Sequence, residues 1–360
     1  MQNDNLPKMV TLSHVAKKAG FSLATVSRVL NHGGPASDET RRRILEVAKQ
    51  QGYVPDPRFR LMGRRRESQA YRTGNIGVVL GQVWSPSGFV SSSFAGRLFW
   101  SLESEATKHG RNLILSTYGA SNDQYVPRFV RDLHVDGVIV AERLTAGVVQ
   151  RIAAIRPVVL VNIEEEDVPT TSFMPNEAAS VRKALAYLSS LGHRRIAFFF
   201  IDDRNPPCLH HHRRREEFFA LTQAEPGRFS PILAVLPRRG QNLVETAMNQ
   251  LRAWTDSGQM PTALLCAADT YAIAFLEAAE KMGIRVPGDL SVMGVDDIEA
   301  GRYVRPKLTT MRHPLEAMGQ AAIQAILQRI DASDDETPVK TVQLFDVDLI
   351  ERESCGPCPQ

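Results

Sequence analysis

The stretch Thr11–Asn31 reads TLSHVAKKAGFSLATVSRVLN and decides how the rest of the chain is interpreted. Its first half predicts a helix that Thr11 caps and whose apolar residues are Leu12, Val15, Ala16 and Ala19. Gly20 ends this helix, because glycine adopts a positive φ without a steric penalty. Ser22 caps a second helix that buries Val26, Val29 and Leu30. The pattern predicts two short helices joined by a tight turn.

The second helix has a polar side opposite its apolar one. With about 100° between successive residues, that side carries Ala24, Ser27, Arg28 and Asn31. An arginine fork donates two hydrogen bonds to a guanine edge, and a short helix fits the major groove of DNA. An ordinary helical hairpin is the alternative. We interpret the stretch as a DNA-binding helix-turn-helix.

The charge of the chain is distributed unevenly. Residues 1–72 hold 14 Lys and Arg against 6 Asp and Glu, whereas the rest of the chain holds 29 against 34. A basic head on a mildly acidic body is typical of a protein that places only its head on phosphates. At 360 residues the chain is long enough for two or three domains.

Helix signals and linker signals set the expected domain boundaries. Ser37 caps a third helix, which buries Ile44, Leu45 and Ala48 and ends at Gly52. We therefore expect a helix-turn-helix domain over 1–56. The segment 57–75 follows as a linker, because it is rich in Arg and interrupted by Pro57 and Gly63. Its arginines bind nucleic acid or form a merely solvated basic spacer.

From residue 76 onward, short apolar runs alternate with helical segments. Strands are predicted at 76–81, 112–117, 137–142, 158–162, 196–201, 232–236, 262–268 and 290–295, with helices such as 97–109, 178–191, 243–256 and 270–282 between them. This alternation predicts an α/β core of two doubly wound parallel-sheet lobes over 76–360. We expect the first lobe at about 76–162 plus 300–330, and the second at about 163–297 plus 335–360. Ligands of such folds bind beyond the carboxyl ends of the strands, here between the lobes.

The sequence indicates a cytoplasmic protein that does not enter a membrane. It has no apolar run of the roughly 20 residues that span a bilayer, and its start lacks the apolar core of a signal peptide. Cys355 and Cys358 form CGPC, but no helix follows to stabilise a thiolate, so we expect a frayed tail. His210–His212 are expected in an exposed loop, because consecutive histidines do not share one face. We find no catalytic constellation, cofactor motif or metal site.

The chain resembles the LacI/GalR family of bacterial transcription regulators along nearly its whole length. The resemblance is carried by the head, by ASDETRRRILEVAKQQGYVPD, by YLSSLGHRRIAFF, by GIRVPGDLSVMGVDDI, by LTTMRHPLEAMG and by LIERES. It implies a homodimer whose heads bind a near-palindromic operator in double-stranded DNA. It also implies a core similar to periplasmic sugar-binding proteins, in which a small molecule, such as a sugar, alters DNA affinity.

The resemblance implies roles for individual head residues. Base-reading positions correspond to Leu23, Ala24 and Arg28, of which Arg28 is the expected source of specificity. Leu23 contacts a thymine methyl or is plain packing. Phosphate-contacting positions correspond to Thr11, Ser22, Thr25, Ser27 and Asn31, each of which is alternatively only a cap or a solvated polar group.

The linker departs from the family pattern. Asp56 and Pro57 replace the usual Asn and the residue after it, and Phe59 stands where a small residue is common. Met62 falls at the position of the family leucine that inserts into the minor groove, with Leu61 beside it, and we expect one of the two to be that wedge.

The resemblance also implies effector-binding residues in the core. Asp269 ends the block PTALLCAAD and binds ligand hydroxyls, caps the following helix, or does both. Arg215 aligns with a family arginine that contacts ligands, or it forms a surface ion pair. Phe94, Trp84 and Phe89 are candidates for stacking on a sugar, although most buried aromatics are only core. Phe218 replaces a glycine and is expected to narrow the pocket.

A ligand-responsive transcriptional repressor is the leading hypothesis. A regulator that has lost effector sensing is an alternative, because the segment around Trp84 and Phe94 is atypical for the family. A solute-binding receptor explains the two lobes but not the DNA-binding head. An enzyme of doubly wound fold would need a reactive group, and none has the required neighbours.

Overall fold

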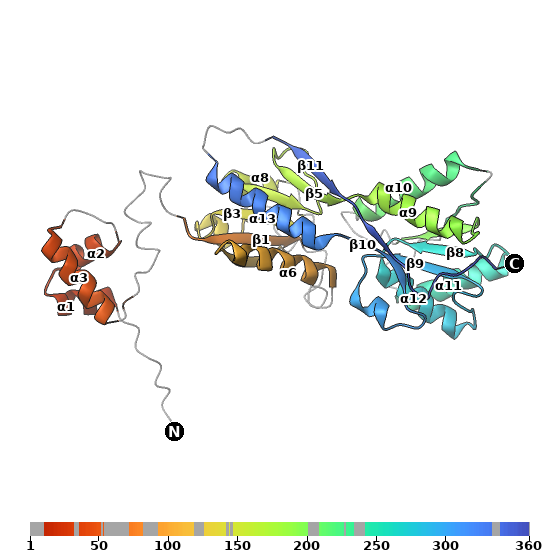
Figure 1. The fold of residues 1–360 in the computed structure, drawn as a ribbon, viewed down its shortest axis with the longest axis horizontal. Helices are drawn as coiled ribbons and strands as arrows, with labels where there is room; N and C mark the ends of the chain where they lie inside the picture. Colours follow the sequence, from red (N-terminus) through yellow and green to blue (C-terminus); the bar gives the residue numbers. More distant parts are fainter. Residues whose placement is uncertain are drawn as a thin grey trace, which may run out of the picture. The chain divides into compact units, whose positions relative to one another are not determined.

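The computed structural model describes residues 11–31, 36–51, 53, 72–81, 93–118, 126–141, 144, 147–200, 209–226, 228–233, 242–332 and 339–359. The chain divides into two compact units, residues 1–73 and 74–360. The first is called the head below, and the second the core (Figure 1).

The described part of the head consists of three helices around one small apolar centre. They are α1 (Leu12–Ala19), α2 (Leu23–Asn31) and α3 (Asp38–Gln50). Gly20 has a φ of 76° and ends α1, as predicted. The buried residues are Val15, Ala16, Ala19, Val26, Val29, Leu30, Ile44 and Ala48. Leu45, predicted to be buried, is 50% exposed, because it lies about 100° around α3 from the buried Ile44.

The first lobe of the core is a parallel sheet between two layers of helices. The strands are β1 (Asn75–Gly81), β2 (Asn112–Tyr118), β3 (Gly137–Ala141), β4 (Val158–Val161), β5 (Thr171–Pro175) and β11 (Thr341–Phe345), in the order β11-β5-β4-β3-β1-β2. One face packs against α6 (Ser93–Lys108) and α13 (Leu315–Asp331), and the other against α7 (Arg128–Arg131) and α8 (Val148–Ala153). Because both faces are covered, β3 and β4 are buried along their whole length.

The second lobe repeats this architecture. Its strands are β6 (Ile196–Phe199), β7 (Ile232–Leu233), β8 (Ala263–Cys266), β9 (Ser291–Val295), β10 (Thr309–Arg312) and β12 (Asp348–Ile350), in the order β12-β10-β9-β8-β6-β7. Only β12 is antiparallel to its neighbour among the described pairs. The helices are α9 (Glu177–Ser190), α10 (Leu209–Ala224), α11 (Leu243–Asp256) and α12 (Asp269–Lys281), with the 3-10 helix η1 (Glu299–Arg302). The predicted fold class is confirmed.

Four strands were not predicted from the sequence, and they change the lobe boundaries. They are β5, β10, β11 and β12, which are short and contain polar residues, so no continuous apolar run marks them. The predicted second lobe included β5 and β11, but both belong to the first sheet. The predicted first lobe included β10, which belongs to the second sheet. These corrections follow from hydrogen-bonded pairing between strands far apart in sequence.

Within the described residues the chain passes between the lobes three times. The passages lie between β5 and α9, between β10 and α13, and between β11 and β12 (Figure 1). Each passage joins the two sheets where side chains of both lobes meet. The crossovers therefore bring residues from distant parts of the sequence to one place.

The CGPC segment is docked on the second lobe, so the expectation of a frayed tail is wrong. Cys355 is buried, and its thiol lies 3.3 Å from the carbonyl oxygen of Val292. His193 Nε2 lies 3.0 Å from the carbonyl oxygen of Gly356, to which it donates. Burial raises the pKa of the Cys355 thiol to about 12, which opposes thiolate formation. Among the described helices, none is both long and apolar enough to cross a membrane.

Candidate functional site

The exposed side of α2 carries the predicted base-reading residues. Ala24 and Arg28 are exposed, and Leu23 is 50% exposed. Leu23 is therefore not simply packed in the head, which was the alternative interpretation. Val26 and Val29 point the other way, into the apolar centre. Helical periodicity thus separates a side that holds α2 in place from a side that is free to contact a partner.

The predicted phosphate-contacting residues lie mostly at helix starts. Ser22 Oγ accepts the backbone N–H of Thr25 at 3.1 Å and lies 2.8 Å from its hydroxyl, so Ser22 caps α2. The backbone N–H of Thr11 donates to His14 Nδ1 at 3.2 Å at the start of α1. Thr11 and Ser22 are exposed, and Thr25 and Ser27 are half-buried. The side chain of Asn31, and the hinge candidates Leu61 and Met62, lie outside the described residues.

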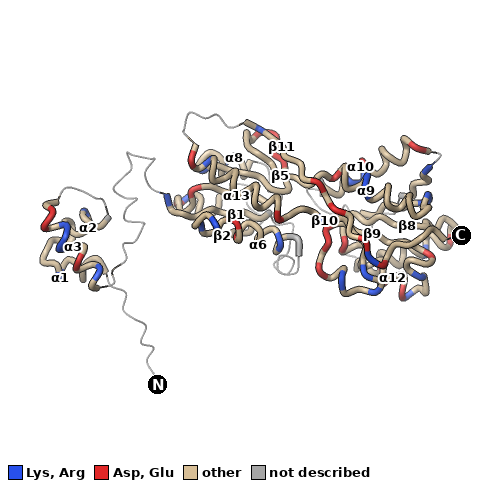
Figure 2. Tube along the Cα trace, in the orientation of Figure 1, with Lys and Arg blue, Asp and Glu red and all other residues tan. Residues whose placement is uncertain are grey.

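The head carries a surplus of positive charge. Residues 11–51 contain seven Lys and Arg against three Asp and Glu. Figure 2 shows basic residues on the helices of this unit. A positive surface attracts the phosphate backbone whatever the base sequence, so it complements the base-reading role expected of α2.

A buried charged cluster lies where the two lobes meet. Its members are Glu177 at the start of α9, His210 and Arg214 on α10, and His313 just after β10. Arg214 grips the Glu177 carboxylate with two hydrogen bonds, Nε to Oε2 at 2.5 Å and Nη2 to Oε1 at 2.8 Å. Arg214 Nη2 also lies 3.1 Å from His313 Nε2. Bidentate pairing of this kind fixes both geometry and charge.

The cluster lies at the carboxyl ends of strands from both sheets. Arg214 also donates to the carbonyl oxygen of Ala267, which follows β8. His210 Nε2 lies 2.7 Å from the carbonyl oxygen of Asn162, which follows β4 of the first lobe. Arg213 pairs with Glu164 at 3.0 Å near the same point. This is the position at which doubly wound folds bind small molecules.

The surroundings of the cluster shift its ionisation. Burial alone raises the pKa of Glu177, but the charge of Arg214 and the hydrogen bonds from His210 and Arg214 outweigh it, so the pKa is lowered. Burial lowers the pKa of His313 to about 3, even though the charge of Glu177 opposes the change. The cluster therefore combines an ionised carboxylate with a neutral imidazole.

Asp269 is buried and already occupied by donors of the protein itself. Its Oδ2 accepts the backbone N–H of Ile298 at 2.8 Å, and its Oδ1 accepts the hydroxyl of Thr310 at 2.5 Å. The side chain has no exposed surface. The helix-capping interpretation is wrong, because α12 begins at Asp269 itself and its N-cap residue is Ala268. In this arrangement Asp269 holds β10 and the segment before η1, and its contact with an effector stays a prediction.

Asp269 gives the stability of the core a specific pH dependence. Burial raises its pKa to about 7, against the opposing hydrogen bonds from Thr310 and Ile298. The folded core therefore binds this proton more tightly than the unfolded chain does. The contribution of Asp269 to the unfolding free energy is fully present at pH values below its ordinary pKa of about 3.8 and is lost as the pH rises through about 7.

Asp269→Asn is expected to remove this decline. The difference in unfolding free energy between the parent and the variant should change by more than about 1 kcal/mol between acid and neutral pH. Urea unfolding at several pH values measures it. Asp289→Asn is the control, because Arg285 lowers the pKa of Asp289 to about 2 and its contribution has the opposite slope. A difference in unfolding free energy between the parent and Asp269→Asn that does not change with pH would contradict a raised pKa for Asp269.

The other predicted effector residues are not brought together by the described structure. Arg215 is half-buried, with its guanidinium carbon 5.2 Å from the centre of the Phe200 ring. Phe218 is fully buried against Phe198, so it belongs to the core of the second lobe and the expectation that it narrows a pocket is wrong. Trp84, Phe89 and the side chain of Phe94 lie outside the described residues.

Sequence reasoning chose the arginine next to the buried one. The buried residues of α10 are His211, Arg214, Phe218 and Thr222, spaced three or four apart. This spacing defines one face of a helix, and Arg215 lies beside it. Extending the stripe backward from Phe218 would have identified Arg214. His210–His212 are in the first turn of α10, so the expected exposed loop is wrong.

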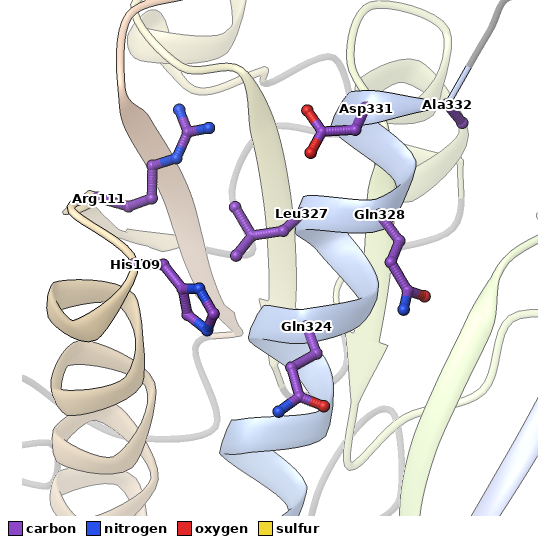
Figure 3. Close-up of a pocket in the computed structure, with 7 residues that line it drawn as sticks. All are labelled: His109, Arg111, Gln324, Leu327, Gln328, Asp331 and Ala332. Atoms are coloured by element: carbon purple, nitrogen blue, oxygen red, sulfur yellow. The ribbon is translucent and has the colours of Figure 1, made fainter.

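A separate hollow of about 660 Å³ lies between the ends of α6 and α13 (Figure 3). It is lined by His109, Arg111, Gln324, Leu327, Gln328, Asp331 and Ala332. Arg111 immediately precedes β2, so this hollow is at the amino-terminal end of the first sheet, away from the crevice where such folds bind ligands. Within the described ranges, the structure holds no cluster of three or more His, Cys, Asp or Glu suited to a metal ion.

Comparison with known proteins agrees with this architecture. Residues 11–56 match the family described as bacterial regulatory proteins, lacI family, and residues 185–355 match a periplasmic binding protein-like domain. An uncharacterized HTH-type transcriptional regulator of Streptomyces limosus is 31% identical, covering 98% of this chain and 96% of its own. The ribose operon repressor of Haemophilus influenzae is 27% identical, over 89% and 92% of the two chains.

The fold has a solved counterpart. A crystal structure of the lac repressor dimer bound to operator and an anti-inducer has a TM-score of 0.67 and 23% identity, covering 96% of this chain and 99% of that one. Head and core together define a class of protein, the DNA-binding regulators with a periplasmic binding protein-like core. The chain belongs to the lacI family of bacterial regulatory proteins and is a DNA-binding transcriptional regulator.

Proposed function

We propose that this protein is a cytoplasmic, homodimeric repressor that binds a near-palindromic operator through its two heads. The observation that carries the proposal is the exposed side of α2, with Arg28 at its centre, on a basic head that matches the lacI family. Arg28 reads a base, and Leu23 and Ala24 contact base edges by apolar surface. The phosphate backbone of the DNA is contacted by Thr11, Ser22, Thr25, Ser27 and Asn31. Leu61 or Met62 wedges into the minor groove.

Selection of bound sites from random duplex DNA tests the proposal. We expect the full chain to enrich two half-sites related by a two-fold axis, because a symmetric dimer requires a symmetric site. The binding should weaken steeply with salt, in proportion to the phosphates contacted. Absence of any preference over scrambled competitor at physiological salt would overturn it.

The proposed effector is a sugar or a related metabolite bound between the lobes. The charged cluster at the carboxyl ends of β4 and β8 supports this, since polar groups of both lobes meet there. A relative named as a ribose operon repressor supports a sugar. The effector acts by binding one arrangement of the lobes more tightly than another, which alters operator affinity.

Thermal melting with a panel of sugars and related metabolites tests effector sensing. A ligand at about a hundred times its dissociation constant adds roughly 2.7 kcal/mol of stability, which is a readily measured shift. A compound that raises the melting temperature should also change operator affinity. If no compound stabilises the protein, the alternative of a regulator without effector sensing is favoured.

A further inference from the structure

His210 joins the two lobes through both nitrogens of its ring. Nε2 lies 2.7 Å from the carbonyl oxygen of Asn162, which directly follows β4 of the first lobe. Nδ1 lies 3.0 Å from Oε1 of Glu177, at the start of α9 in the second lobe. His210 itself belongs to α10, whose Phe218 packs in the core of the second lobe. One largely buried imidazole therefore ties the first lobe to the charged cluster of the second.

The partners of His210 determine its protons. A backbone carbonyl only accepts hydrogen bonds, so Nε2 must carry a proton. The Glu177 carboxylate is gripped by Arg214, and its lowered pKa keeps it ionised, so it also only accepts. Nδ1 must then carry a proton too. His210 is consequently an imidazolium in this arrangement.

His313 shows the opposite state in the same cluster. Arg214 Nη2 can only donate, so the His313 Nε2 that lies 3.1 Å from it must accept and carries no proton. Nδ1 of His313 faces Asp296 at 3.5 Å. The two histidines therefore differ because one faces two acceptors and the other faces a donor.

We propose that His210 is a proton-dependent latch between the lobes. A neutral ring can donate through one nitrogen only, so it keeps either the bond to Asn162 or the bond to Glu177, and its other nitrogen faces an acceptor lone pair. Rising pH therefore releases the latch, and falling pH closes it, because the loss of either ring proton leaves one of the two acceptors without its donor. The closed arrangement of the lobes takes up a proton.

The charges around the latch come from both lobes. Glu177 comes from α9, Arg213 and Arg214 from α10, His313 from the passage after β10, and Glu164 from the segment after β4. Arg213 pairs with Glu164 across the lobes at 3.0 Å. Among these groups, His210 is the one whose two hydrogen bonds to acceptors together need both ring protons.

Nitrogen-15 spectroscopy of histidine-labelled full-length protein tests the proton count directly. At about pH 6, His210 should give two slowly exchanging ring N–H signals, because both protons are hydrogen-bonded and largely shielded from water. The exposed His134 provides the comparison, since its ring protons exchange rapidly. Both signals should vanish in His210→Gln. A single ring N–H signal for His210 at this pH would overturn the latch.

Urea unfolding tests the coupling of the latch to pH. Glutamine has no ring that carries N–H donors on opposite sides, so it cannot donate to the Asn162 carbonyl and the Glu177 carboxylate at once. His210→Gln should therefore lower the urea concentration at the unfolding midpoint. The sign is fixed by linkage: a proton bound in the folded state stabilises at low pH and its contribution is lost as pH rises. The loss of unfolding free energy in His210→Gln should be at least about twofold larger at roughly pH 6 than at pH 8.

His134→Gln is the matched control and should show no such pH-dependent difference. An equal loss at both pH values for His210→Gln would show that the residue is only structural and would overturn the proposal. Neither experiment uses DNA or an effector, so failure of the latch is distinguishable from failure of the proposed function.

Discussion

Arg214→Met is expected to lower the unfolding free energy of the core by about 3–5 kcal/mol. The substitution leaves the buried Glu177 carboxylate without its two hydrogen bonds from the guanidinium, at 2.5 and 2.8 Å. It also removes the donor to His313 and to the Ala267 carbonyl. A buried charge without its partner is costly because water cannot replace the lost bonds. Urea unfolding followed by the fluorescence of the buried Trp254 measures the loss.

Arg213→Met is the matched control for this prediction. Arg213 is adjacent in sequence and makes its ion pair with Glu164, but its side chain is 36% exposed. A partly exposed pair contributes up to about 1 kcal/mol, so the control should cost much less. The double variant Glu177→Gln/Arg214→Met removes both charges and should recover part of the stability. Equal losses for Arg213→Met and Arg214→Met would refute the importance of the buried pair.

The effect of Arg214→Met should also depend on pH. The lowered pKa of Glu177 means that its contribution is present above the ordinary value of about 4.5 and is lost as the pH falls. The difference between the parent and the variant should therefore shrink on acidification. A difference that grows in acid would have the wrong sign.

Arg28→Ala is expected to weaken specific operator binding by about ten- to a hundredfold, because a bidentate arginine contributes roughly 1–3 kcal/mol of discrimination. Arg28 is exposed on α2, so the substitution should leave the melting temperature of the head unchanged. Titration of the variant against the selected operator and against scrambled duplex measures the ratio. The specific affinity should fall while the non-specific affinity changes little.

Arg28→Lys separates the effect of the planar arginine side chain on DNA binding from the effect of its charge. Lysine retains the positive charge but lacks the planar fork, so it should keep the salt dependence and lose base preference. Repeating the site selection with Arg28→Ala should relax the preference at one position of each half-site. If the selected sites are identical to those of the parent, Arg28 does not read a base.

Much of the fold follows from local patterns. The predicted helix 243–256 agrees with α11 at both ends, and the eight predicted strands all have counterparts. These elements are marked by apolar spacing or by continuous apolar runs, which depend on neighbouring residues only. Ser22, Gly20 and Ser37 acted as expected because caps and turns are also local interactions.

The predicted effector site depended on more than local pattern. Asp269 was recognised as a polar group at the end of a strand, but its donors come from Ile298 and Thr310, 29 and 41 residues away. The docking of Cys355 against Val292 has the same origin. Pairings of this kind depend on how the sheets assemble, so a short pattern does not contain them.

The sequence by itself determined the helix-turn-helix head, the two parallel sheets and the family. Helical and strand periodicities are short-range, and they survive whatever the rest of the chain does. Only the tertiary structure decided which groups the buried Arg214 contacts. Arg214 meets Glu177 and His313 across 37 and 99 residues, and those contacts depend on how the strands and helices of the second lobe assemble. The passage from β5 to α9 is what brings His210 of the second lobe to the Asn162 carbonyl oxygen of the first, and the packing of α10 against α9 brings it to Glu177.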